Sequence, residues 1–184
     1  MITLILLGML VVCLIHLTQL DLLDPNQLTI PTLHWWGHPM RNNLRAYLKK
    51  QVDDRDFTIH YHIGGGLSGK TDFRLQGDGS YELWSTVTKG RERKSYCGQV
   101  ETSQVEQVVQ DMLATKVWQA RHLYPTPALD DPDAKIAVKA GDQKSEVVLW
   151  VSEIRESPPF QKAQGQLLSL IHDLSQGEVL ENGQ

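Results

Sequence analysis

One stretch of the chain matches a pattern that is typical of phosphate-binding loops. Residues 64–71 read GGGLSGKT, which satisfies G-x-x-x-x-G-K-[ST]. In that motif the loop amides and a helix N-terminus converge on the phosphates, and the final hydroxyl binds magnesium where the helix begins. After Thr71, however, Phe73 and Leu75 alternate with charged residues, which is the period of a strand. The stretch therefore predicts a glycine-rich hairpin loop, with nucleotide binding as the alternative.

A second pattern with possible chemistry is the pair His60 and His62. Side chains two apart in a strand lie about 6 to 7 Å from one another on one face, a spacing that can chelate zinc when a third ligand arrives. The register that keeps the apolar residues together puts Asp72 opposite His62 and Arg74 opposite His60. Because a cation beside the site opposes a metal, we expect two surface histidines on a charge-paired face, with zinc as the alternative.

No other constellation supports catalysis. The carboxylates of Asp130, Asp131 and Asp133 lie in a proline-containing loop, where such a run is usually solvated. The serines lack a nucleophile-elbow context, and Cys97 has no basic neighbour beyond Lys94. The net charge of -4 comes without a basic stripe, so nucleic acid is not an expected partner. We expect a protein that is not an enzyme and holds no metal or cofactor.

The elements that carry these residues follow from periodicity. Residues 57–63 alternate apolar and polar side chains, and pairing Ile59 with Leu75 and Tyr61 with Phe73 keeps both apolar sets on one face. A turn at residues 77–79 leads to a third strand, and a further turn around residues 89–94 leads to a fourth. These segments predict an antiparallel meander of four strands.

Helices and a second hairpin complete the pattern. Ser103 and Glu106 form a capping-box pair before a helix with an apolar stripe. Residues 136–138 and 147–151 predict a hairpin around Gly141. Ser157 and Pro158 begin a last helix, which Gly177 ends. The fold class is α+β, a mainly antiparallel sheet packed with two helices in the order ββββαββα.

The N-terminus predicts a membrane anchor. Residues 2–20 carry no formal charge, and a helix of that length just crosses a hydrocarbon core of about 30 Å. A cleaved signal peptide is the main alternative, but it needs a basic residue before the apolar run and small residues at a cleavage site, and both are missing. We expect a single-pass membrane protein. The flanks supply no charges that orient it, and the extracytoplasmic side is favoured for the soluble domain.

The predicted boundaries are an anchor at 1–20, a linker with a short amphipathic helix at 21–55, the α+β domain at 56–177 and a tail at 178–184. The linker assignment rests on scattered prolines and glycines before residue 40. The helix that follows carries Arg41, Arg45, Lys49 and Lys50. Its basic face predicts either a solvated surface or contact with anionic headgroups.

The folded part, residues 59–174, resembles the emfourin-type domains, small bacterial proteins whose founding members inhibit thermolysin-like metalloproteases. The resemblance rests on a glycine loop after the first strand, an Asp78-Gly79 hairpin, an Asp before a late strand at Asp133 and a closing helix. That helix is entered by Pro158-Pro159 and carries Leu167, Leu170 and Ile171. The anchor, the basic helix and the Lys70-Thr71 pair depart from it.

The resemblance implies a non-enzymatic domain that offers loops to a partner's cleft. The expected function is a membrane-tethered protein-binding module, with protease inhibition as its narrower form. The candidate contact residues are Gly65, Gly66, Leu67, Ser68 and Gly69. The alternatives are a nucleotide-binding protein that uses residues 64–71 and an accessory subunit of a membrane complex.

Overall fold

The computed structural model describes residues 38–64, 69–87, 92–123 and 131–179. They form α2 (Pro39–Leu48), β1 (Phe57–Gly64), β2 (Lys70–Gln76), β3 (Ser80–Val87), β4 (Glu92–Gln99), α3 (Thr102–Thr115), β5 (Asp133–Ala140), β6 (Gln143–Trp150) and α4 (Pro158–Leu174). Short 3₁₀ helices lie at η3 (Asp54–Asp56), η4 (Val117–Gln119) and η5 (Val151–Glu156). The α+β class and the order of four strands, helix, two strands and helix are confirmed.

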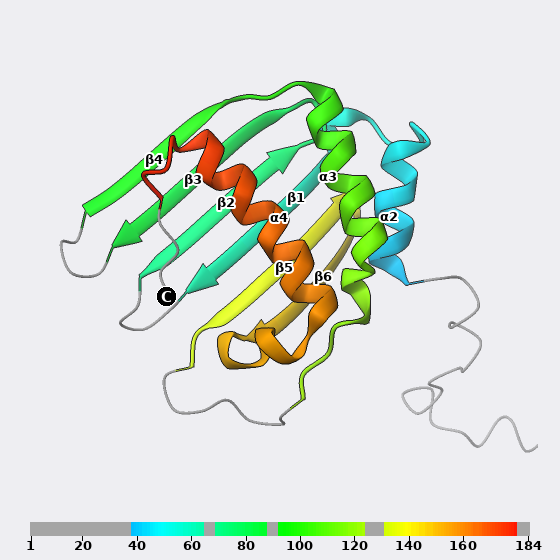
Figure 1. Ribbon diagram of the computed structural model, residues 1–184. Coiled ribbons are helices and arrows are strands. Elements are labelled where there is room, and N and C mark those ends of the chain that lie inside the picture. Colours follow the sequence, from blue (N-terminus) through cyan, green and yellow to red (C-terminus); the bar gives the residue numbers. More distant parts are fainter. Residues whose placement is uncertain (1–37, 65–68, 88–91, 124–130, 180–184) are drawn as a thin grey trace, which may run out of the picture. The chain divides into compact units, whose positions relative to one another are not determined.

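The strands form one six-stranded antiparallel sheet in the order β4-β3-β2-β1-β5-β6 (Figure 1). The register predicted from the apolar pattern is confirmed, with Ile59 opposite Leu75 and Tyr61 opposite Phe73. After α3 the chain returns to the far side of β1, where β5 pairs with it. The pairing of β1 with β5 therefore joins the four-stranded meander to the second hairpin.

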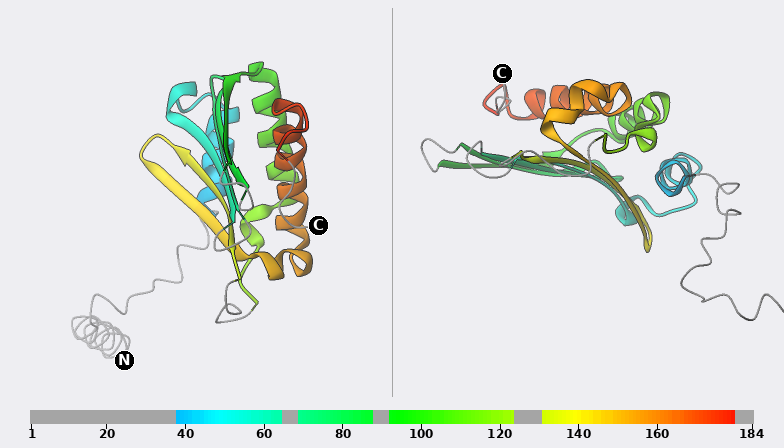
Figure 2. Two further views of the ribbon diagram at one scale, coloured as in Figure 1. Left: turned by 90° about the vertical axis from the view of Figure 1, so that its left-hand side faces the viewer. Right: turned by 90° about the horizontal axis from the view of Figure 1, so that it is seen from below.

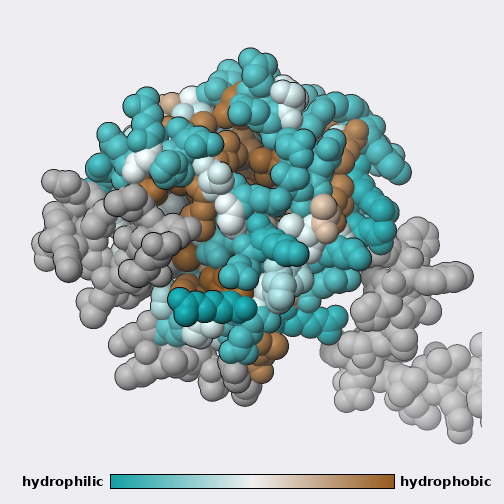
Figure 3. Space-filling model, viewed as in Figure 1, coloured by the Kyte–Doolittle hydropathy of each residue, from teal (hydrophilic) through white to brown (hydrophobic). Residues whose placement is uncertain are grey.

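One face of this sheet carries the core. The helices α2, α3 and α4 all lie on that side (Figures 1 and 2). The sheet contributes fully buried side chains from Phe57, Ile59, Tyr61, Phe73, Leu75, Leu83, Ile136, Val138 and Leu149. The helix α4 adds Phe160, Ala163, Leu167 and Ile171, and the buried Gln164 amide donates a 2.9 Å hydrogen bond to the Tyr61 hydroxyl. On this helix side the surface is mostly hydrophilic, with small hydrophobic areas between polar ones (Figure 3).

The helix α2, which the sequence predicts as part of the linker, belongs to the folded unit. Its Met40, Leu44 and Tyr47 are completely buried and pack against the rest of the core. The Tyr47 ring stacks on Phe57 at 4.2 Å, and its hydroxyl donates a 2.9 Å hydrogen bond to the Gly77 carbonyl. The compact unit accordingly begins at Gly37, well before the predicted residue 56. Met40, Leu44 and Tyr47 form an apolar stripe with helical spacing that packs against β5 and β6, and the basic residues of this segment lie outside the stripe.

Two helix starts differ in detail from the predicted caps. The helix α3 begins at Thr102 after Glu101, and no side-chain cap bond is made, so the predicted Ser103–Glu106 capping box is wrong. Ser103 lies inside the first turn, where its hydroxyl is not in the cap position. The last helix does begin at Pro158 after Ser157, although the Ser157 side chain forms no cap bond either.

The second hairpin turn depends on a glycine. Gly79 has φ +91°, and a Cβ placed there would lie 2.1 Å from the Val100 carbonyl oxygen. The turn also uses Asp78, whose carboxylate accepts hydrogen bonds from the Ser80 amide at 2.9 Å and the Ser80 hydroxyl at 2.7 Å. A left-handed residue without a side chain is therefore required where β2 turns into β3.

No helix among the described residues is long and apolar enough to cross a membrane. The predicted anchor, residues 2–20, lies outside the described residues.

Candidate ligand-binding face of the sheet

Among the described residues, no helix or loop segment covers the side of the sheet opposite α2, α3 and α4. Its side chains alternate with those of the core, and we call it the open face, made of Thr58, His60, His62, Asp72, Arg74, Gln76, Glu82, Trp84, Ala137, Lys139 and Lys144. Toward β6 the sheet bends away from the helices, so the open face is concave (Figure 2). Strand alternation thus gives one apolar face that the helices bury and one polar, hollowed face.

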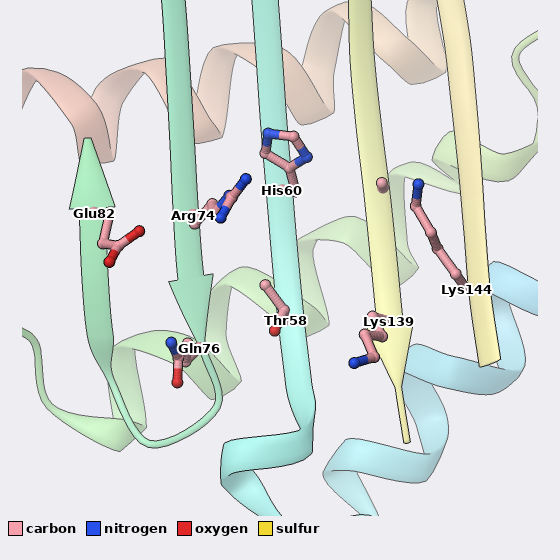
Figure 4. Close-up of a pocket in the computed structure, with 8 residues that line it drawn as sticks. Thr58, His60, Arg74, Gln76, Glu82, Lys139 and Lys144 are labelled. Atoms are coloured by element: carbon pink, nitrogen blue, oxygen red, sulfur yellow. The ribbon is translucent and has the colours of Figure 1, made fainter. Parts of the chain in front are cut away.

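A hollow of about 340 Å³ lies on the open face. Its lining is Thr58, His60, Arg74, Gln76, Glu82, Ala137, Lys139 and Lys144, from five adjacent strands. In Figure 4 the helices lie behind the strands, and Arg74 extends from β2 toward β1 beside His60. The floor is formed by the short side chains Thr58 and Ala137, and longer polar side chains surround them. This size accommodates one side chain or a small ligand.

Asp72 joins the two histidines of β1. One carboxylate oxygen lies 3.0 Å from His60 Nε2, and the other lies 3.2 Å from His62 Nδ1. All three side chains are mostly buried, with 21% of His60, 14% of His62 and 15% of Asp72 exposed. The Asp133 carboxylate lies 3.9 Å from His62 Nε2, at the other side of that ring. Asp72 therefore accepts two ring N–H hydrogen bonds and fixes both imidazoles.

Protonation in this cluster follows from burial and charge. Burial lowers the pKa of His60, and Lys135 and Arg74 also lower it, against the opposing effect of Asp72. Burial raises the pKa of Asp72, but His60 and His62 outweigh this effect and hold that pKa below its ordinary value. At neutral pH Asp72 is thus a carboxylate and His60 a neutral imidazole. With its Nε2–H donated to Asp72, His60 keeps an acceptor lone pair on Nδ1, the ring atom on the β5 side in Figure 4.

This cluster corrects part of the sequence prediction. The backbone register is confirmed, with Arg74 opposite His60 and Asp72 opposite His62. The His60 side chain nevertheless turns diagonally to Asp72, because a desolvated imidazole N–H needs an acceptor that a guanidinium cannot supply. Among the described residues, no group of three or more His, Cys, Asp or Glu side chains is arranged to hold a metal ion.

Three cations line the hollow, and only Lys144 forms an ion pair among the described residues. Arg74 lies over the Trp84 ring at 5.4 Å from its centroid, and Arg93 approaches the same ring at 5.9 Å. Lys144 lies 3.0 Å from Glu146. Neither Arg74 nor Lys139 forms an ion pair with a residue that the structure describes. The hollow therefore combines positive charge with hydrogen-bond donors and acceptors.

The arrangement offers binding more readily than covalent chemistry. An aspartate that orients a histidine is one half of a nucleophile-activating set, and the other half is a hydroxyl or thiol bonded to the second ring nitrogen. Within the described ranges no such group is hydrogen-bonded to His60 Nδ1. What the hollow does supply is positive charge and hydrogen-bonding groups, a combination that suits an anion.

The predicted glycine loop is only partly described. Gly65, Gly66, Leu67 and Ser68 lie outside the described residues, and Gly69 has φ +88° just before β2. Lys70 is 56% exposed at its side chain, 3.9 Å from Asp72. Thr71 is buried within β2, with its hydroxyl 3.4 Å from that of Ser85. The two residues after the loop are thus strand residues, as the alternation predicts.

Sequence reasoning missed a second cluster, around Glu153. Its carboxylate is completely buried and accepts hydrogen bonds from the Leu123 amide at 2.8 Å, the Trp150 amide at 3.1 Å and His122 Nδ1 at 2.8 Å. His122 is 41% exposed at its side chain and nevertheless belongs to this buried cluster. His122 lies 31 residues from Glu153 in the sequence and Leu123 lies 30 residues from it, so no local pattern reveals these contacts. The cluster fastens the chain after η4 to η5, which is a structural role.

A scan of protein-family models and a search of curated proteins find no match to this chain.

Proposed function

We propose that the chain is a membrane-tethered, non-enzymatic protein-binding module whose contact surface is the open face of the sheet. The observation that carries the proposal is the arrangement of the layers. Three helices pack on one side, while the concave side keeps a hollow lined by side chains from five strands (Figures 2 and 4). A rigid sheet holds these side chains in fixed positions, which favours recognition of a shaped partner.

The tether is proposed from the sequence. Residues 2–20 are uncharged and sufficient in length for a span, and they precede the compact unit that begins at Gly37. A binding domain held at a membrane meets partners at a raised effective concentration, so modest affinity is sufficient.

Photocrosslinking tests the contact surface. A photoreactive amino acid at Gln76 or Glu82, on the open face, is expected to give a covalent adduct with one and the same protein in the producing cell. The same amino acid at Gln110 of α3 or Gln161 of α4, both exposed on the helix side, is the matched control. Adducts from the helix positions with none from the open face would place the contact elsewhere and reject the proposal.

Protease inhibition is the narrower form of this proposal, supported by the resemblance to emfourin-type domains and by Gly69, whose φ of +88° suits a shaped loop. Purified protein is expected to lower the activity of thermolysin at stoichiometric concentration. Unchanged proteolysis at a large molar excess would remove the inhibitor assignment and leave the binding module standing.

A further inference from the structure

We infer that the partner presents an acidic polypeptide segment to the open face, with one of its carboxylates seated in the hollow between Arg74 and Lys139. This inference rests on the proposed function, because it names the chemistry of the segment that the same surface binds. It follows from the charge of the lining, the donors that point into it and the shape of the face.

The charge of the hollow differs in sign from that of the chain. The whole chain has a net charge of -4, yet the lining contains Arg74, Lys139 and Lys144 against a single carboxylate, Glu82. Lys144 is shared with Glu146, whereas Arg74 and Lys139 have no ion-pair partner among the described residues. Glu82 lies opposite Arg74 in the register of β2 and β3, but the two side chains do not form an ion pair. Cations that line one hollow without ion pairs attract an anionic ligand.

The donors suit a carboxylate. Arg74 extends toward β1 (Figure 4). Its guanidinium also lies 5.4 Å from the centroid of the Trp84 ring, a contact that restricts its position. A planar guanidinium held in this way binds a carboxylate through two parallel N–H hydrogen bonds. The Thr58 hydroxyl and Gln76 amide at the same hollow add neutral donors. One carboxylate side chain therefore finds both charge and hydrogen bonds there.

A polypeptide is favoured over a nucleic acid by what lies around the hollow. Glu82 lines it and Glu146 lies beside Lys144, so the open face alternates cations with carboxylates and has no continuous basic stripe that could track a phosphate backbone. The Trp84 ring of the open face is already in contact with Arg74 and Arg93, so it offers no free platform for stacking a base. An acidic peptide can place its carboxylates at the cations and its amides elsewhere along the strands.

The test uses the full chain in mild detergent and a fluorescein-labelled decaglutamate peptide as the probe. Saturable binding is expected by fluorescence anisotropy, with no binding of the matched decaglutamine. The double variant Arg74→Gln, Lys139→Gln is expected to weaken the affinity by about tenfold to a hundredfold, since two charge-assisted contacts are lost. The control variant Lys49→Gln, Lys162→Gln removes the same charge from exposed positions at the C-cap of α2 and on α4, and its affinity is expected to stay within about twofold.

Three results would overturn the inference. They are the absence of saturable decaglutamate binding, an equal loss in the double and control variants, and tighter binding of decathymidylate that disappears in the double variant. Far-UV circular dichroism checks that both variants fold. If the double variant does not fold, Lys139→Gln alone is measured, because this exposed lysine is not part of the core. An affinity unchanged by that substitution also rejects the inference.

Failure here is distinguishable from failure of the proposed function. Crosslinks from Gln76 and Glu82 to one protein, combined with no decaglutamate binding, would keep the open face as the contact surface and reject its acidic ligand. Decaglutamate binding without any crosslinked protein would instead keep the anion site and reject the binding module.

Discussion

At the scale of single residues, burial keeps His60 neutral at pH 7, and Asp72 fixes the orientation of its ring. A carboxylate that accepts from both rings satisfies its own lone pairs and leaves the second nitrogen of His60 beside the hollow. Because His60 is neutral at pH 7, the positive charge of the hollow comes from Arg74 and the lysines alone. At a lower pH His60 takes up a proton and adds to this positive charge.

The first prediction concerns pH and stability. The folded-state pKa of His60 lies below its ordinary 6.5, so below that pH the unfolded chain binds a proton that the folded protein does not. The free energy of unfolding is therefore expected to fall as the pH decreases from 6.5 through the folded-state pKa of His60. Below pH 3.8 it falls further, since the pKa of Asp72 is also lowered in the folded state.

Urea unfolding at pH 7 and pH 5 measures this effect. His60→Gln keeps an N–H donor for Asp72 and removes the titration, so the difference in unfolding free energy between the two pH values is expected to be smaller in this variant. An identical difference in both proteins would show that His60 does not contribute to it.

The second prediction concerns Lys70 and nucleotides. Lys70 is an exposed strand residue beside the buried Thr71, so Lys70→Ala is expected to change the free energy of unfolding by no more than about 0.5 kcal/mol. Magnesium with ATP or GTP is expected to leave the melting temperature unchanged. Saturable nucleotide binding that disappears in Lys70→Ala would instead support the phosphate-loop alternative.

At the scale of elements, the sequence predicts strands well and α2 poorly. The period of two in β1 and β2 and the short loop between them define both the register and the buried face. In and just after α2 the basic residues draw attention to the polar face, and only the tertiary structure shows that Met40, Leu44 and Tyr47 bury the other face against β5 and β6. The charges within a segment do not show which distant part of the chain its apolar face will pack against.

The third prediction follows from α2. Leu44→Ala is expected to lower the free energy of unfolding by about 2 to 5 kcal/mol, because it leaves a cavity in a fully buried position. Arg45→Ala, at the exposed neighbour, is expected to change it by less than about 0.5 kcal/mol. Denaturant melts of both variants measure the difference. Equal effects of the two substitutions would show that α2 does not pack into the core and is part of the linker.

The fourth prediction compares two glycines. Gly79→Ala is expected to lower the free energy of unfolding by about 1 to 3 kcal/mol, because φ is +91° and the new Cβ meets the Val100 carbonyl. Gly165→Ala, in the middle of α4 where the new Cβ would meet no atom within 4 Å beyond the adjoining residues and helix backbone, is expected to raise it by about 0.5 to 1 kcal/mol. Thermal melts of the two variants should therefore move in opposite directions, and a shift in the same direction contradicts the prediction.

At the scale of the whole molecule, the fifth prediction concerns the tether. Deletion of residues 2–20 is expected to move the protein from the carbonate-washed membrane pellet to the supernatant. The melting temperature is expected to stay unchanged, since the compact unit begins at Gly37. A truncated protein that remained in the pellet would show that another part of the chain holds it there.

How much of the candidate site could be predicted depends on the range of the interactions. The face that holds His60, Asp72 and Arg74 follows from strand alternation and register. The contributions of Lys139 and Lys144 do not, because the pairing of β5 with β1 joins segments far apart in the chain. The same limit hid the His122–Glu153 contact. Local periodicity reveals a face, whereas the neighbours of that face depend on topology.

The position of β1 has a consequence for synthesis. β1 lies inside the finished sheet between β2 and β5, yet β5 begins only at Asp133, after the whole meander and α3. During synthesis, the edge of β1 that later pairs with β5 therefore has unpaired amides and carbonyls until the ribosome has translated β5. Such an edge is a template for pairing with another nascent chain. The slower the segment before β5 is translated, the longer this β1 edge stays exposed. The exposure ends when the β5–β6 hairpin pairs with β1.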